Sequence, residues 1–141
     1  MTDSASLDLV RSIYADWERG DFGHAAEWAD PSIEYLIADG PDPGEWTGLG
    51  SAAAATRRLL STWKDYRFEV DEYRVLDGER VLVLVIRRGR GGTSGLDLGH
   101  MQTEGAHVFH VRDGKVIRLV AYWDRDRAFA DLGLSPEGDA T

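Results

Sequence analysis

The first part of the chain places its apolar residues at helical spacing. Residues 6–20 form one amphipathic segment, which Ser6 can cap and Gly20 can end. The apolar face of this segment is made of Leu7, Val10, Ile13, Tyr14 and Trp17. Asp21 can cap a shorter helix that ends near Trp28, because a proline follows closely and disfavours further helical geometry. We therefore predict two helices before the first strand.

A strand, a loop and a third helix come next. Residues 32–37 read as the first strand, and residues 38–50 read as a loop because of their proline and glycine content. Ser51 can cap the third helix, which Trp63 closes. Its buried stripe is predicted to contain Ala52, Thr56, Leu59, Leu60 and Trp63.

From Tyr66 onward the apolar period is two, which is typical of strands. The predicted strands cover residues 66–75, 81–86, 98–112 and 115–123, with a bulge near residues 71–72 where the parity changes. Asp113-Gly114 turns the third of these strands into the fourth, and Asp124 begins a short helix that Gly133 ends. Residues 87–95 are rich in glycine and read as a flexible hairpin, where Arg87, Arg88 and Arg90 could meet an anion.

This order of elements predicts an α+β domain, with a bent antiparallel sheet and helices gathered on one face. Residues 81–86 are all apolar, so both faces of that strand must be covered. With no helix left for the second face, we expect another copy of the chain to cover it. The pairs Val108 with Val120 and Val81 with Val83 therefore predict a two-fold homodimer through the outer sheet face.

Length and charge limit the function classes. The chain has 141 residues, so we expect a single domain over residues 1–141, with a core over about 7–134 and a flexible tail at 135–141. Its net charge of −9 disfavours nucleic acid and anionic membranes as partners. The chain has no cysteine, and its first residues are polar and lack a signal-peptide pattern. We expect a cytoplasmic protein.

The second half of the chain resembles a known family. The string "EGAHVFHVRDGKVIRLVAYWDRDRAFADLGL", preceded by "WADPSIEY" and "EWTGLG", is similar to the SnoaL-like branch of the nuclear transport factor 2-like (NTF2-like) superfamily, in order over about residues 7–134. The resemblance implies a cone in which three N-terminal helices close over a curved sheet around an internal pocket. It also implies pairing of two copies through their sheets, but no single activity.

The resemblance also separates the two histidines of "HVFHVRDGKV". His107 and His110 are three apart on one strand and so face opposite sides. In steroid isomerases of the superfamily an acid on this strand points into the cavity, and counting back from the Gly-Lys pair puts His107 at about that place. His107 is therefore the cavity candidate, and metal binding by the pair is not expected.

His107 has two interpretations. A neutral imidazole can serve as a general acid or base, and a histidine on a half-buried strand can equally be a core residue with one hydrogen bond. A catalytic His107 needs a partner, and the candidates are Glu34, Tyr35, Glu104 and Asp124. Tyr35 can instead be packing, and Asp124 can instead cap the last helix.

The known catalytic sets of the superfamily do not carry over to this sequence. In the steroid-isomerase set, the place of the helix tyrosine falls on Ile13, with Tyr14 one step away, and the place of the base falls near Tyr35 or Leu36. The trio used by epoxide hydrolases is not visible either, because Arg118 shares its parity with His110 on the outer face.

The remaining candidates concern the pocket and its ligand. Aromatic residues are core by default, yet five tryptophans in a small domain suit a cavity for a flat apolar ligand. The expected pocket residues are Tyr14, Trp17, Trp46, Leu60, Trp63, Phe109, Leu119, Ala121 and Trp123. We expect no cofactor and no metal. Three hypotheses stay open: an isomerase, cyclase or hydrolase acting on a hydrophobic cyclic substrate with His107 as acid or base, a non-catalytic binder of a hydrophobic small molecule, and a dimeric interaction module.

Overall fold

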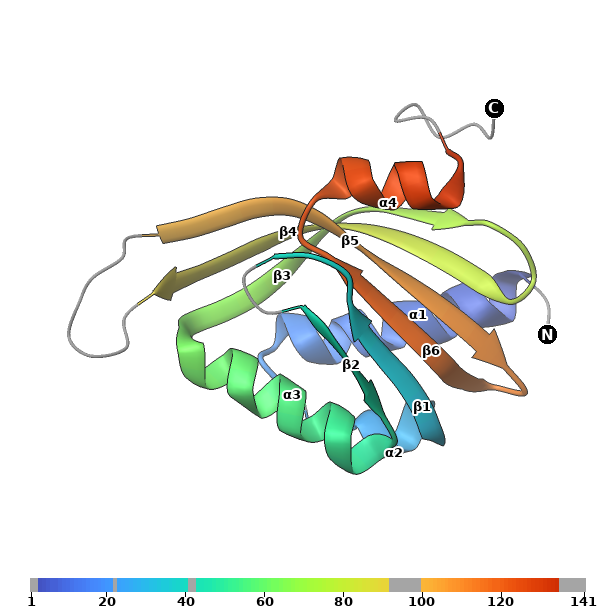
Figure 1. Cartoon of the computed structure of the whole chain (residues 1–141). Coiled ribbons are helices and arrows are strands. Elements are labelled where there is room, and N and C mark those ends of the chain that lie inside the picture. The colour runs from blue at the N-terminus through green and yellow to red at the C-terminus, as the bar shows by residue number, and fades with distance from the viewer. Residues whose placement is uncertain (1–2, 22, 41–42, 92–99, 135–141) are drawn as a thin grey trace.

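A curved six-stranded sheet is the centre of the molecule, and helices lie on both of its faces (Figure 1). The computed structural model describes residues 3–21, 23–40, 43–91 and 100–134. Inside these ranges the side chains of residues 3–4, 59–60, 62–66, 90–91 and 100–102 are outside the description. The tail predicted at residues 135–141 and most of the predicted glycine-rich hairpin are also outside it.

The elements follow the predicted α+β order, which confirms the fold class. The helices are α1 (Asp3–Glu18), α2 (Ala25–Trp28), α3 (Leu49–Thr62) and α4 (Arg125–Leu132). The strands are β1 (Ala29–Ile37), β2 (Gly44–Thr47), β3 (Trp63–Val75), β4 (Arg80–Gly91), β5 (His100–Arg112) and β6 (Lys115–Tyr122). No helix in the described parts of the chain is both long enough and apolar enough to cross a bilayer.

The sheet is antiparallel except at one pair of strands. Its strand order is β2-β1-β6-β5-β4-β3, and β1 runs parallel to β6. Strand β2 lies inside the segment predicted to be a loop, where it pairs with β1. The predicted bulge is confirmed, because the β3–β4 register shifts between Val70 and Glu72. Such an extra residue bends a strand and increases its twist, which helps to curve the sheet around the helices.

The two N-terminal helices differ from the prediction at their starts. Helix α1 begins before Ser6, which is fully buried and donates its hydroxyl proton to the Gly78 carbonyl at 2.9 Å. Helix α2 is one turn long and does not begin at Asp21. The Asp21 carboxylate accepts the backbone N–H of Gly23 at 3.2 Å, a local turn that competes with helix formation.

The inner face of the sheet carries the main core, between the sheet and α1. Val81, Val83 and Val85 of β4 point inward, together with Phe109 and Leu119 of the next two strands. The prediction that Val81 and Val83 face outward was therefore wrong. The outward residues are their neighbours, because a slip of one position exchanges the two faces of a strand.

The outer face is covered by α4, which corrects the view that all helices lie on one face (Figure 1). Ala128 and Phe129 of this helix pack on an apolar cluster from β4, β5 and β6, formed by Leu82, Leu84, Ala106, Val108, Val120 and Tyr122. These residues are buried within a single chain. The homodimer through this face stays a prediction, and the apolar residues on which it was based already have an intramolecular cover.

Candidate functional site

A cavity of about 560 Å³ lies between the inner face of the sheet and the helices. Most of the described residues that line it are apolar, and four are aromatic: Trp17, Trp28, Tyr35 and Phe68. The polar groups among them are the Tyr35 hydroxyl, Thr56, Arg57 and His107. No aspartate or glutamate is found among the described lining residues.

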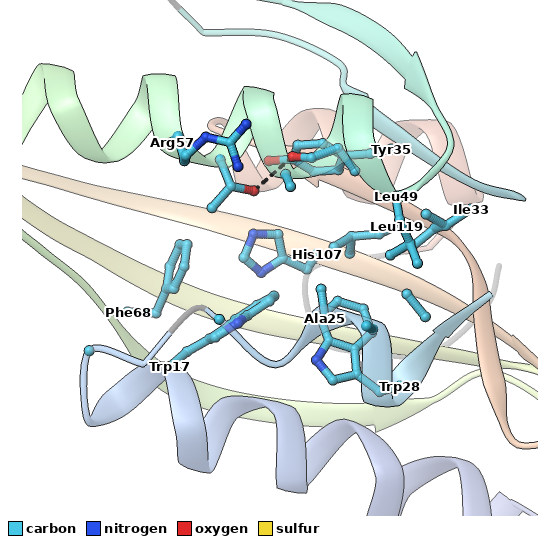
Figure 2. Close-up of a pocket in the computed structure, with 17 residues that line it drawn as sticks. Trp17, Ala25, Trp28, Ile33, Tyr35, Leu49, Arg57, Phe68, His107 and Leu119 are labelled. Atoms are coloured by element: carbon cyan, nitrogen blue, oxygen red, sulfur yellow. Dashed lines mark hydrogen bonds between the residues drawn. The ribbon is translucent and has the colours of Figure 1, made fainter. Parts of the chain in front are cut away.

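The two long sides of the cavity differ in chemistry (Figure 2). Trp17 and Trp28 lie on one side, with their ring centroids 6.0 Å apart in an edge-to-face arrangement. Arg57 of α3 and Tyr35 of β1 lie on the opposite side, and His107 lies between the two sides. Ala53, one helical turn before Arg57, is small enough to leave space beneath α3.

His107 lies inside a cage of aromatic rings. The ring centroids of Tyr14, Trp17, Phe68 and Phe109 are 5.9, 5.9, 5.0 and 6.2 Å from that of His107. The residue is only 3% exposed, although it contributes to the cavity wall. The period-two alternation along β5 correctly predicted that His107 faces inward. The side chains packed around the ring fix its orientation.

Both ring nitrogens of His107 have protein partners. Nδ1 is hydrogen-bonded to the Tyr14 hydroxyl, and Nε2 lies 3.2 Å from Nη2 of Arg87. Arginine can only donate hydrogen bonds, so Nε2 must accept. The neutral ring therefore carries its proton on Nδ1 and donates it to the Tyr14 oxygen. It follows that the proton of the Tyr14 hydroxyl points away from His107.

Burial, and after it the nearby Arg87 guanidinium, holds the pKa of His107 well below its ordinary value of 6.5. To act as a base, the ring would have to release Arg87 and become a second cation beside it. To act as an acid, the neutral ring would have to lose its Nδ1 proton, which is far too weakly acidic for chemistry near neutral pH. The arrangement thus favours a fixed, neutral imidazole.

Arg87 is the unexpected residue of this network, because the sequence placed it at a flexible hairpin. It lies in β4 at the same parity as Val85, and it is 2% exposed. Its Nη1 donates to the Tyr122 carbonyl at 2.5 Å. Its guanidinium carbon lies 4.8 Å from the centre of the Trp123 ring and 5.7 Å from that of Phe68. Contacts with aromatic faces stabilise a cation that is removed from water.

Two backbone features make room for Arg87. A Cβ atom on Gly105 would collide with Nη1 of Arg87 and with the Tyr122 carbonyl oxygen, so only glycine leaves space there. The main chain at Trp123 is fixed by the Asp39 carboxylate, which accepts the backbone N–H of Trp123 at 2.6 Å. Gly40, at φ +90°, lies directly against the Trp123 ring.

The structure brings together some of the predicted site residues. Trp17, Tyr35, His107 and Leu119 line the cavity. Tyr14 and Phe109 are fully buried around His107 behind its wall, and Ala121 is buried on β6 opposite His107. The Trp46 ring packs at a tilt against Tyr35, and the Trp123 ring lies against the Arg87 guanidinium. The side chains of Leu60 and Trp63 lie outside the described residues.

None of the proposed carboxylate partners of His107 lies at the cavity. Glu34 and Glu104 are exposed. Asp124 is the N-cap of α4, where its side chain accepts the N–H of Asp126. The partners that the structure gives His107 are Tyr14 and Arg87.

Two signals in the sequence point to these partners in hindsight. Tyr14 sits in the middle of the apolar stripe of α1, and a buried tyrosine hydroxyl needs a polar partner. Arg87 continues the inward parity of residues 81, 83 and 85. Nothing in the sequence signals a metal centre, and the described residues contain no group of three histidine, aspartate or glutamate side chains able to bind one.

Residues 10–119 match the family model of the SnoaL-like domain. The chain belongs to the SnoaL-like family. Comparison with curated proteins gives no match.

Solved structures similar to this SnoaL-like chain include three with named activities or ligands. A "putative polyketide cyclase" from Xanthomonas campestris pv. campestris is 22% identical with a TM-score of 0.70, covering 91% of this chain and 96% of the other. TerC co-crystallised with polyporic acid is 19% identical with a TM-score of 0.70, covering 91% and 97%. An LEH-like epoxide hydrolase of M. tuberculosis is 17% identical with a TM-score of 0.66, covering 86% and 84%. At these identities the likeness shows the shared NTF2-like cone.

Gly105→Ala tests the space that this SnoaL-like chain reserves for Arg87. We expect the free energy of unfolding to fall by about 2 kcal/mol or more, because the added methyl group displaces a buried cation from its carbonyl partner. Gly50→Ala is the matched control, since nothing lies within 4 Å of its Cβ position in α3. The control should be neutral or stabilising by about 0.5 kcal/mol. Urea unfolding measures the change in the free energy of unfolding for both variants. Equal changes would show that Gly105 does not provide space that Arg87 needs.

The neutral state of His107 predicts an acid-sensitive stability. The unfolded chain takes up a proton on this histidine near pH 6.5 and the folded chain does not, so the free energy of unfolding falls as the pH drops below 6.5. The contribution is up to about 1.4 kcal/mol per pH unit. His107→Gln should remove this part of the pH dependence of the free energy of unfolding, which urea unfolding between pH 7.5 and 5 measures.

The control for this experiment is His110→Gln. The pKa of His110 is also lowered by burial, but its ring is partly exposed and has no role in the network. In this variant the free energy of unfolding should still fall on acidification by most of the amount seen in the unchanged chain. If the free energy of unfolding of His107→Gln depends on pH as strongly as that of the unchanged chain, His107 is not the buried neutral group described here.

Proposed function

We propose that the chain binds a hydrophobic cyclic small molecule inside the cone. The observation that carries the proposal is the cavity of about 560 Å³, which has aromatic walls and few polar groups. This volume lies within the range of small-molecule sites, which are typically concave, largely apolar and supplied with a few convergent polar groups. Flat ring systems fit between aromatic walls because they gain both buried area and ring contacts.

Similar structures support the proposal at the level of analogy. TerC was co-crystallised with a small molecule, polyporic acid, and two other neighbours carry the names of small-molecule enzymes. A shared fold does not transfer an activity. Binding within the cone therefore rests chiefly on the lining residues of this chain.

Catalysis on the same ligand is the second candidate. It is favoured by the position of His107 in the cavity wall and by the cyclase and hydrolase names of similar structures. Isomerase, cyclase or hydrolase chemistry with His107 as acid or base would require a ligand to displace Arg87 or the Tyr14 hydroxyl from the ring. Because no carboxylate is found among the described lining residues, binding is the better supported of the two.

Filling the cavity tests the binding proposal. Ala53→Phe places a ring into the cavity from α3, whereas Ala54→Phe adds the same group on the exposed side of the same helix. A panel of neutral bicyclic and polycyclic compounds should raise the melting temperature of the unchanged chain and of Ala54→Phe. It should have little effect on Ala53→Phe. No shift from any compound, or equal shifts in both variants, would contradict the proposal.

His107→Gln separates the two candidates for a compound found in that panel. Glutamine keeps the approximate size and the hydrogen bonding of the ring but cannot transfer a proton. A binder should keep its affinity within a few-fold in calorimetry. An enzyme that relies on His107 as acid or base should lose roughly 10²-fold or more in turnover. The binding assignment is overturned if the compound is converted and the conversion depends on His107 in this way.

A further inference from the structure

We propose that the ligand is an anion, a planar cyclic carboxylate whose charged group binds Arg57 while its rings lie against the tryptophans. The inference rests on the proposed binding function and adds the chemical class of the ligand. It is based on the position of one cation, on the polarity of the cavity walls and on the charges around them.

Arg57 lies where a ligand's polar end would meet it. It follows Ala53 by one turn of α3, and both residues line the cavity. Its side chain is exposed, and Figure 2 shows it on the same side of the cavity as Tyr35. Among the described residues no hydrogen bond or ion pair of the Arg57 side chain is found, whereas the buried Arg87 side chain is held by Tyr122 and His107.

The other polar groups of the wall cannot provide this charge. The Thr56 hydroxyl donates its proton to the Ala52 carbonyl at 3.1 Å, so its oxygen is left as an acceptor. His107 is neutral, and both its nitrogens are engaged. Arg57 is thus the cation that the described lining residues offer to a ligand.

The opposite side of the cavity determines how such a ligand is oriented. Trp17 and Trp28 present rings with no charged group between them, and Phe68 extends this surface (Figure 2). A ring system against these residues would direct its substituent toward α3. A guanidinium binds a carboxylate through two parallel hydrogen bonds, which gives geometry as well as charge.

The net charge of −9 does not oppose this arrangement at close range. Exposed charges are screened over about 8 Å at physiological salt, so the contact with Arg57 outweighs the distant carboxylates. None of the described lining residues is acidic, and so none of them repels an anion at contact.

The experiment compares two probes of the same shape, 2-naphthoate and the neutral 2-naphthalenemethanol, by isothermal titration calorimetry. The unchanged chain should bind the carboxylate about tenfold or more tightly than the alcohol. Arg57→Gln should abolish this preference by weakening only the carboxylate. Arg58→Gln is the matched control, because it makes the same charge change at the next residue of α3, which is exposed and does not line the cavity.

The outcomes separate this inference from the binding proposal. If neither probe binds the unchanged chain, both are overturned. If the alcohol binds as tightly as the carboxylate, binding stands and the anionic ligand is rejected. Equal weakening of the carboxylate by Arg57→Gln and Arg58→Gln would show an effect of overall charge and would reject Arg57 as the recognition group.

Discussion

Arg87 carries a full positive charge at 2% exposure, and the interior of the cone is arranged around it. Removing such a charge from water costs roughly several kcal/mol unless hydrogen bonds and nearby electron density replace the lost hydration. Here the Tyr122 carbonyl, the Nε2 atom of His107 and two aromatic faces surround the guanidinium. Gly105 provides the space, since any side chain at that position would occupy it.

The position of Arg87 also determines the hydrogen bonds of the residues around it. Because the guanidinium only donates, it fixes the tautomer of His107, and that tautomer in turn fixes the Tyr14 hydroxyl as an acceptor from the ring. A side chain often associated with proton transfer is thereby held neutral and occupied. In the binding function that we propose, the cavity beside it acts through its shape, its aromatic surface and the charge of Arg57.

Much of the fold could be predicted from alternation and from turn chemistry. The period of two around the Asp113-Gly114 turn placed His107 inside and His110 outside. The change of parity predicted a bulge near residues 71–72, and the register shifts between Val70 and Glu72. Alternation alone fails where a run is apolar on both faces. In residues 81–86 it gave no means to decide which valines face inward, so the choice of Val81 and Val83 as outer residues was wrong.

The site was less accessible to sequence reasoning because its partners are distant in the chain. Tyr14 and His107 are 93 residues apart, and Arg87 and His107 are 20 apart on neighbouring strands. The partners predicted for His107, which were three carboxylates and Tyr35, include neither Tyr14 nor Arg87. The requirement that a buried tyrosine, histidine and arginine satisfy one another is visible only when the sheet and α1 are packed together.

The protonation state of His107 can be measured most directly by nitrogen-15 NMR of the imidazole ring across a pH titration. The account predicts a neutral ring at pH 7 with the proton on Nδ1, and a titration midpoint well below 6.5. A ring that is protonated at pH 7, or neutral with its proton on Nε2, would contradict the network of Arg87, His107 and Tyr14.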